Sequence, residues 1–316
     1  MSISSVASRI GVERVAGYLG AEITGVHLTE DLDREVVREV LDALLEWKVL
    51  IFRNQDFTPE QHARIVSQFG AVNHCHPTIP PVHPELPEIF ETTNELNRLV
   101  AKQGSNEYDD NRFHIDQSFV VNPPAITTLH GVVVPPYGGD TIFTDLVAAY
   151  EELSEPIRQL IDGLRAVHAN VSHVDPEGPK GEPKSVFERR GYRTIHPVVR
   201  VHPVTGKRSL FVEPGLTSHL EGLTRAEADA VITLLYNQLA RPDFTARFRW
   251  STGDLIMFDN RAVAHRAPGD LRHLDFPRVL HRVVLRGDIP VGPDGFRSEI
   301  ISGQPFGEPL PPYYPA

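Results

Sequence analysis

Residues 125–143 read AITTLHGVVVPPYGGDTIF, and this stretch indicates a fold built mainly from short β-strands. Three strand-like runs, Ala125–Leu129, Val132–Val134 and Thr141–Phe143, are separated by glycine or proline. Glycine offers no side chain to pack, and proline cannot donate a ladder hydrogen bond, so both residues interrupt strands. The pattern therefore predicts several short strands rather than long helices.

The same pattern extends over about residues 85–290, with further runs at Val198–Val201, Leu210–Val212 and Leu255–Phe258. Two predicted helices interrupt it, Leu146–Leu164 and Thr224–Leu239, the second beginning with a capping box. Many short strands with few long helices are typical of a barrel or jelly roll decorated by helices. We therefore expect a mainly β fold with flanking helices.

The segment before this region mixes strands and helices. Helical spacing of apolar residues predicts a helix over Asp31–Trp47, and Thr58 with Pro59 predicts the start of another that ends near Phe69. The predicted strands are a pair within Tyr18–Leu28, broken at Gly20 and Gly25, and a single strand over Lys48–Phe52.

Composition excludes several classes of protein. The formal charge is 31 − 42 = −11, which argues against nucleic acid as the main ligand, because phosphate binding needs a basic surface. The single cysteine, Cys75, excludes an intrachain disulfide and a cysteine-rich metal site. No run approaches the roughly 18 apolar residues of a membrane span, and Met1–Arg14 lacks the apolar core of a signal peptide. We expect a cytoplasmic protein with no membrane partner.

No repeat or linker divides the chain, so residues 1–316 are expected to form a single domain. The segment 173–193 is rich in proline, glycine and charge, and a loop of this length is often an active-site lid. An ordinary exposed loop is the alternative. The proline-rich tail, 303–316, is expected to be extended. We also expect a homo-oligomer, a dimer or a tetramer.

The chain has 15 histidines, so a chance pattern must be separated from a metal site. A histidine followed two residues later by an acid occurs five times, and only His114–Asp116 lies in a convincing strand-like setting, Phe113–Phe119. Residues i and i+2 of a strand project from the same face, so both side chains could meet one ion. A metal role for this pair is one interpretation and a structural role is another.

A second histidine, His265, follows the apolar run Leu255–Phe258 and the polar residues Asp259-Asn260-Arg261. Two imidazoles and one carboxylate form the facial triad of non-haem Fe(II) oxygenases, which leaves three coordination positions open. Zinc also binds such residues, so the triad alone does not identify the metal.

Two arginines and a threonine extend the hypothesis. Arg278 and Arg282 are four residues apart on a predicted strand and face one way, and buried arginines need anions. Gly138-Gly139-Asp140-Thr141 places a hydroxyl at the start of another strand. A guanidinium and a hydroxyl could together hold the far carboxylate of a dicarboxylic cosubstrate whose near end binds the metal.

Taken together and in order, these motifs resemble the taurine dioxygenase (TauD/TfdA) family of Fe(II)- and 2-oxoglutarate-dependent oxygenases. The resemblance runs from about Gly20 to Pro290 and includes His196–Pro203 and Phe248-Arg249-Trp250. It implies a double-stranded β-helix, that is, a cupin-like jelly roll. It also implies O2 as the oxidant and succinate and CO2 as products.

The resemblance assigns roles residue by residue. His114, Asp116 and His265 would bind iron, and Arg278, assisted by Thr141, would pair with the 2-oxoglutarate C5 carboxylate. The keto acid would fill two open positions at the metal and O2 the last. The protein would place one substrate C–H bond near the oxidant and exclude water.

The substrate pocket is expected to hold a small organic anion. Arg282 matches the family arginine that binds a sulfonate or sulfate, and His76 matches the histidine that assists it. The other residues expected in the pocket are Gln117, Asp110, Ile79 and Leu216.

Three of these residues depart from taurine-specific members of the family. Ile79 replaces a tyrosine, Asp110 an asparagine and Leu216 an aromatic residue. A more apolar pocket would suit an alkyl sulfate or a longer organic acid, although Asp110 could still pair with the ammonium group of taurine.

The sequence therefore predicts an Fe(II)/2-oxoglutarate-dependent dioxygenase that hydroxylates a sulfonate or alkyl sulfate and releases sulfite or sulfate with an aldehyde. The same chemistry on an amino acid or biosynthetic intermediate is an alternative. A non-catalytic jelly-roll sensor of 2-oxoglutarate is another, from a different class. A zinc hydrolase would leave Arg278 and Thr141 without a role.

Overall fold

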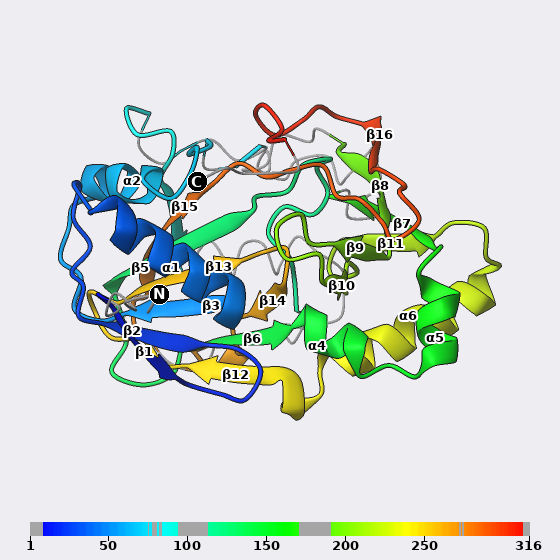
Figure 1. The fold of residues 1–316 in the computed structure, drawn as a ribbon, viewed down its shortest axis with the longest axis horizontal. Coiled ribbons are helices and arrows are strands. Elements are labelled where there is room, and N and C mark those ends of the chain that lie inside the picture. Colours follow the sequence, from blue (N-terminus) through cyan, green and yellow to red (C-terminus); the bar gives the residue numbers. More distant parts are fainter. Residues whose placement is uncertain are drawn as a thin grey trace, which may run out of the picture.

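The largest sheet in the described part of the chain has seven strands, and it lies beside the N-terminal helices (Figure 1). The computed structural model describes residues 9–74, 76–77, 81, 84–93, 113–170, 191–271, 273 and 275–311. The strand order of this sheet is β1-β2-β3-β13-β5-β15-β4, in which β2 and β3 run parallel and the other neighbours are antiparallel. The strands are β1 Gly11–Arg14, β2 Ala21–Thr24, β3 Val49–Phe52, β4 Phe90–Thr93, β5 Ile126–Val133, β13 Leu255–Asp259 and β15 Val279–Val284.

A three-stranded sheet of order β12-β6-β14 shares a hydrophobic core with the large sheet. Its strands are β12 Thr245–Phe248, β6 Thr141–Asp145 and β14 Val263–Arg266. Phe143 and Phe248 of the small sheet pack with Ile51, Ile256 and Phe258 of the large one. Two mainly antiparallel sheets around one core agree with the jelly roll that the sequence predicted.

Two N-terminal helices cover the other face of the large sheet. The helices are α1 Arg34–Trp47 and α2 Pro59–Ser67, and α1 lies across β3 and β13 (Figure 1). In β3, Leu50 and Phe52 pack on the helix side, whereas Val49 and Ile51 pack between the sheets. Both faces of the central strands are buried, which explains why these strands are apolar throughout rather than alternating.

The second part of the fold holds a four-stranded sheet, β11-β7-β8-β16, a ribbon of β9 and β10, and three helices. The strands are β7 Arg165–Ala169, β8 Arg193–Pro197, β9 Val199–Val201, β10 Arg208–Leu210, β11 Thr217–Leu220 and β16 Glu299–Ser302. The helices are α4 Leu146–Glu151, α5 Glu155–Ile161 and α6 Arg225–Leu239, with short 3-10 helices at Pro242–Phe244 and Gly269–Leu271.

The prediction of one helix over Leu146–Leu164 was wrong, because the chain forms α4 and α5 with a break between them. Pro156 cannot donate a hydrogen bond to the carbonyl four residues earlier, and its ring would collide with that carbonyl. Proline is favourable in the first turn of a helix, so a new helix begins there with Ser154 as its N-cap. The capping box predicted at Thr224 is confirmed, and the helix predicted to start at Thr58 also begins with a capping box.

Two strand predictions also differ from the structure. Gly131 does not divide residues 125–134, because β5 runs through it. A Cβ on Gly131 would lie 3.1 Å from the Ser251 carbonyl oxygen and 3.3 Å from the Trp250 ring, so glycine permits close packing there. Within Tyr18–Leu28 only β2 forms, and its hairpin partner is the earlier strand β1.

Most of the predicted lid lies outside the described residues, which resume at residue 191, and so do residues 312–316 of the tail. The described part of the tail returns to the body of the protein, where Phe306 is buried and Leu310 forms a bridge with Asp288. Among the described helices, none combines the length and the apolar character needed to cross a membrane.

Candidate active site

Two neighbouring residues, His114 and Asp116, meet the distant His265 in the fold. Each of His114, Asp116 and His265 offers a ligand atom, and these atoms lie within 4.8 Å of one another. His114 and His265 form an antiparallel bridge in which each backbone N–H donates to the other residue's carbonyl oxygen at 2.9 Å. The ring centroids are 4.1 Å apart, so the backbone pairing holds both imidazoles side by side.

The local geometry differs from the predicted strand. His114 takes part in a single bridge, and Asp116 already lies in a turn that extends to Phe119. Gln117, with φ of 52°, has the left-handed backbone conformation that ends the extended segment. His265 lies within β14 and not at the edge of the preceding strand.

The Asp116 carboxylate is held by a small buried network. The Thr127 hydroxyl donates to Asp116 Oδ2 at 2.7 Å, and Asn260 Nδ2 donates to the Thr127 hydroxyl at 2.8 Å. Burial would raise the pKa of Asp116, but the Arg282 guanidinium, the two imidazoles and the Thr127 hydroxyl lower it to about 2. The carboxylate is therefore ionised at neutral pH, as a metal ligand must be.

His265 is packed between Phe143 and Phe258, with ring centroids 5.6 and 4.7 Å away. Burial and the neighbouring His114 lower the pKa of His265 to about 3, so its imidazole is neutral. Its Nδ1 is buried and has no hydrogen-bond partner among the described residues. Two imidazoles, one of them held neutral, an ionised carboxylate and an unsatisfied buried nitrogen fit a divalent transition metal.

Arg278 and Thr141 lie on neighbouring segments, as the predicted cosubstrate site requires. Arg278 is buried, and its Nε donates to the Gly139 carbonyl oxygen at 2.9 Å. Burial lowers the pKa of Arg278 to about 10 against the opposing effect of Asp140 and Asp270, so the guanidinium stays charged at neutral pH. A Cβ on Gly139 would lie 3.0 Å from Arg278 Cδ, which explains the glycine.

Thr141 begins β6, and its hydroxyl oxygen accepts a hydrogen bond from Trp250 Nε1 at 3.0 Å. A hydroxyl that accepts from an indole can still donate its own proton to another acceptor. The Trp250 contact therefore orients Thr141 as a donor. It also gives the tryptophan of the Phe248-Arg249-Trp250 motif a physical role.

Arg282 and His76 lie beside the metal-ligand candidates. Arg282 Nη1 forms an ion pair with Asp116 Oδ1 at 3.1 Å. Burial and the nearby Arg282 lower the pKa of His76 to about 3, so this imidazole is neutral and can offer one N–H to an anion. The positive charge of this pair therefore comes from Arg282 alone.

The remaining predicted pocket residues divide into two groups. Gln117 is buried in the turn after Asp116, and Leu216 packs against a cluster made by Phe119, Val120, Tyr192, Val284 and Phe306. Ile79 and Asp110 lie outside the described residues.

Sequence reasoning missed the buried groups that support the site. Thr127 and Asn260 hold Asp116, and only the Asp259-Asn260-Arg261 motif offered a signal for them. Behind the turn, the Ser118 hydroxyl donates to Glu213 Oε1 and also contacts His168 Nδ1 at 2.9 Å. Burial raises the pKa of Glu213 to about 8, so this carboxyl is mainly protonated at neutral pH. An acid directly after the apolar run Leu210–Val212 was the available signal.

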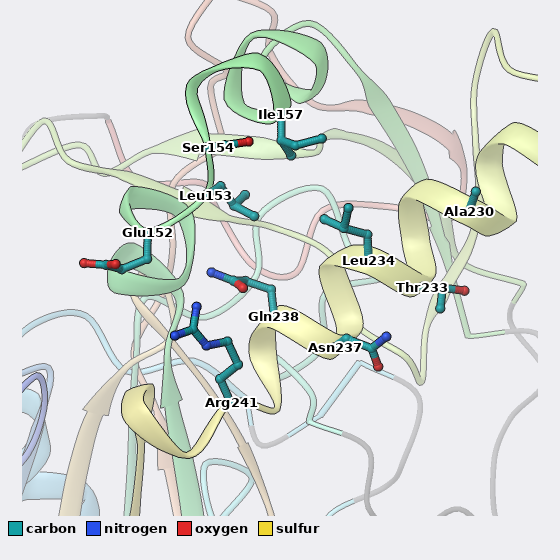
Figure 2. Close-up of a pocket in the computed structure, with 10 residues that line it drawn as sticks. All are labelled: Glu152, Leu153, Ser154, Ile157, Ala230, Thr233, Leu234, Asn237, Gln238 and Arg241. Carbon is teal, nitrogen blue, oxygen red and sulfur yellow. The ribbon is translucent and has the colours of Figure 1, made fainter.

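A separate open groove lies between the α4–α5 turn and α6 (Figure 2). Leu153 and Ile157 face Leu234 and Gln238 across it, with Arg241 at one end. The residues that line it include no histidine and none of the predicted site residues. This groove is therefore not the predicted site.

Comparison with known proteins agrees with this geometry. The model of a family described as "Taurine catabolism dioxygenase TauD, TfdA family" matches residues 11–284. The chain is 37% identical to an alpha-ketoglutarate-dependent sulfate ester dioxygenase of Pseudomonas putida, over 92% of this chain and 93% of that protein. It is 34% identical to an alkylsulfatase of Acinetobacter baylyi, over 94% and 91%. The crystal structure of a taurine dioxygenase from Burkholderia xenovorans superposes with a TM-score of 0.80 at 39% identity, covering 94% of this chain and 97% of that one. This structural likeness, together with the two sheets around one core, confirms the predicted jelly roll.

Proposed function

Since the chain belongs to the taurine catabolism dioxygenase (TauD, TfdA) family, we propose that it hydroxylates a small organic sulfate ester or sulfonate. The protein is an Fe(II)- and 2-oxoglutarate-dependent dioxygenase that consumes O2. Bound iron, with 2-oxoglutarate and O2, supplies an oxidant able to remove hydrogen from an unactivated carbon. The protein's own residues bind, orient and desolvate the reactants.

His114, Asp116 and His265 are the proposed iron ligands. Their support is the mutual approach of three ligand atoms and the ionised state of Asp116. Thr127 and Asn260 would fix the carboxylate orientation, as outer-shell hydrogen bonds do at metal sites. Iron agrees better than zinc with the whole site, since a hydrolytic zinc would leave the buried Arg278 without an anion.

Arg278 and Thr141 are the proposed ligands of the 2-oxoglutarate C5 carboxylate. A charged guanidinium that is buried gains most from a carboxylate partner, because the low local dielectric strengthens the interaction. Trp250 would keep the Thr141 proton directed toward the same carboxylate.

The observation that carries the substrate class is the pairing of Arg282 with His76 next to Asp116. A single guanidinium charge and a neutral imidazole N–H suit one monovalent oxyanion, such as a sulfate ester or a sulfonate. Two of the relatives, those of Pseudomonas putida and Acinetobacter baylyi, are named for sulfate ester and alkyl sulfate chemistry, which agrees with this class.

The proposed reaction converts substrate, 2-oxoglutarate and O2 into hydroxylated substrate, succinate and CO2. If the hydroxyl group is placed on the carbon that bears the sulfate oxygen, the product loses sulfate and leaves an aldehyde. The corresponding sulfonate product loses sulfite. One oxygen atom of O2 enters succinate and the other enters the aldehyde precursor, so the atoms balance.

The test is succinate formation with Fe(II), ascorbate and 2-oxoglutarate, measured with hexyl sulfate, taurine, an aryloxyacetate and a free amino acid. We expect a sulfate ester or sulfonate to stimulate succinate formation and to release sulfate or sulfite in equal amount. Stimulation only by the amino acid would favour a tailoring hydroxylase, and binding of 2-oxoglutarate without succinate would favour a sensor. Either result contradicts the proposed substrate class.

Four further features remain proposals. We infer that residues 1–316 form one domain, that the segment 173–193 closes over the bound substrate, and that the chain forms a dimer or a tetramer. We also infer a cytoplasmic location.

A further inference from the structure

Phe90 lies directly across the sheet from Arg282. The two residues are Cα partners in the antiparallel pairing of β4 with β15. Directly opposite residues of antiparallel strands place their side chains on the same face, close enough to touch. Phe90 is 6% exposed, and the Arg282 side chain is 12% exposed.

The Phe90 ring contacts both members of the proposed anion-binding pair. The Arg282 guanidinium carbon lies 4.6 Å from the ring centroid, within the range of a cation–π interaction. The His76 ring stacks on Phe90 with centroids 5.8 Å apart and an interplanar angle of 29°. The His76 ring centroid also lies 6.1 Å from that of Phe119, so two aromatic rings lie near the imidazole.

Arg282 benefits from such a support because its Nη1 also forms an ion pair with the Asp116 carboxylate, 3.1 Å away. An arginine has several rotatable bonds, and a guanidinium next to a carboxylate is drawn toward it. An aromatic face fixes the plane of the guanidinium without competing for its N–H donors. Those donors can then serve Asp116 and a bound anion together.

We propose that Phe90 is a positioning residue, whose ring holds the Arg282 guanidinium and the His76 imidazole in the orientation that binds the anionic group of the substrate. This inference rests on the proposed function, since it takes Arg282 and His76 as the substrate's anion-binding pair. It goes beyond that proposal because it assigns the geometry of the pair to a side chain that carries no polar group.

The test compares Phe90→Leu with Phe69→Leu. Phe69 is 7% exposed and belongs to the core beneath α1 and α2, so the same change there controls for loss of packing. The first measurement is calorimetric binding of hexyl sulfate to the protein loaded with Mn(II) and 2-oxoglutarate under nitrogen. The second is the KM for hexyl sulfate and for 2-oxoglutarate in the Fe(II) enzyme.

We expect Phe90→Leu to weaken hexyl sulfate binding by about 3- to 30-fold, the range that a desolvated cation–π contact supports. The KM for 2-oxoglutarate should change by less than about twofold, and Phe69→Leu should leave both constants unchanged. An equal rise in both KM values, or hexyl sulfate binding within about twofold of the wild type, would overturn the inference.

A double-mutant cycle separates positioning from direct contact. In an Arg282→Gln background, Phe90→Leu should weaken hexyl sulfate binding by a smaller factor than in the wild type, because the guanidinium that it positions is gone. An equal factor in both backgrounds would show that Phe90 does not act through Arg282 and would overturn the inference.

The two measurements also separate this inference from the proposed function. A wild-type protein that binds hexyl sulfate but forms no succinate with it or with taurine contradicts the proposed function, while the binding comparison still decides the role of Phe90. A wild-type protein that does not bind hexyl sulfate contradicts both, because Arg282 and His76 would then not be an anion-binding pair.

Discussion

Arg282 Nη1 lies 3.1 Å from Asp116 Oδ1, so the proposed substrate arginine is paired with a proposed iron ligand. The opposite carboxylate oxygen accepts from Thr127, and both oxygens of Asp116 are therefore hydrogen-bonded. Asp116 would therefore contact both the bound metal ion and the Arg282 guanidinium. The anionic group of the substrate would bind to the other side of that guanidinium. The following predictions separate the contributions of these groups.

Arg278→Ala and Arg282→Ala should each weaken the binding of a different substrate. We expect Arg278→Ala to raise the KM for 2-oxoglutarate by about 10- to 150-fold, since losing a charge-assisted contact costs about 1.5–3 kcal/mol. Arg282→Ala should weaken the organic anion by a similar factor and spare 2-oxoglutarate. Steady-state kinetics give both KM values for each variant, and each variant is the control for the other. An Arg282→Ala enzyme with substrate affinity within about threefold of the wild type would exclude the anion-binding pair.

Thr127→Val should weaken metal binding while leaving the fold intact. Removal of a hydrogen bond to a ligating carboxylate typically costs about 10- to 100-fold in metal affinity. The matched control is Thr128→Val, because the Thr128 hydroxyl is equally buried but contacts His62 and the Val283 carbonyl oxygen instead. Calorimetric titration with Mn(II) measures both. Equal losses in the two variants would mean that packing, and not the Asp116 contact, is responsible.

Glu213→Gln should make the protein more stable at alkaline pH. Burial raises the pKa of Glu213 from 4.5 to about 8, so its contribution to stability is fully present below pH 4.5 and is lost as the pH rises through 8. A glutamine side chain does not ionise, so the unfolding free energy of the Glu213→Gln variant should not fall as the pH rises toward 8. Urea unfolding at pH 5, 6.5 and 8 measures the effect, with the exposed Glu221→Gln as control. If the unfolding free energies of the wild type and of Glu213→Gln changed in parallel with pH, the Glu213 carboxyl would not be protonated in the folded protein at neutral pH.

Acid should destabilise the protein through its buried histidines. Burial lowers the pKa of His62 well below 6.5, and it lowers the pKa of His168 to about 3. Their contribution to stability is complete above pH 6.5 and is lost as the pH falls toward the folded-state values, because the unfolded chain binds protons first.

His62→Gln tests this acid effect. Each such histidine adds up to about 1.4 kcal/mol per pH unit to the slope of unfolding free energy between these limits. His62→Gln should reduce that slope, whereas the exposed His219→Gln should not. Urea unfolding at pH 6.5, 5.5 and 4.5 provides the slopes, and an unchanged slope for His62→Gln would contradict a buried neutral imidazole.

Local sequence patterns predicted many of the helices and strands. They gave a wrong strand boundary at Gly131, where packing against a distant residue determines the structure. The capping boxes at Thr58 and Thr224 were predictable because the cap and its partner are three residues apart. Gly131 was read as a strand break, yet it lies inside β5 because the distant Trp250 packs against it. The break before α5 could have been predicted from Pro156, which lies in the first turn of the new helix.

The candidate site divides in the same way. The sequence determined the residue types, their order and the family, because motifs such as Asp259-Asn260-Arg261 and Gly138-Gly139-Asp140-Thr141 are contiguous. Only the tertiary structure showed the contacts that hold these side chains: the backbone bridge of His265 with His114, the Thr127 hydrogen bond to Asp116, and the Phe90 ring beside the Arg282 guanidinium. These contacts join segments that are brought together when strands pair in the sheets. Residue spacing and local secondary-structure propensity do not specify which strands pair.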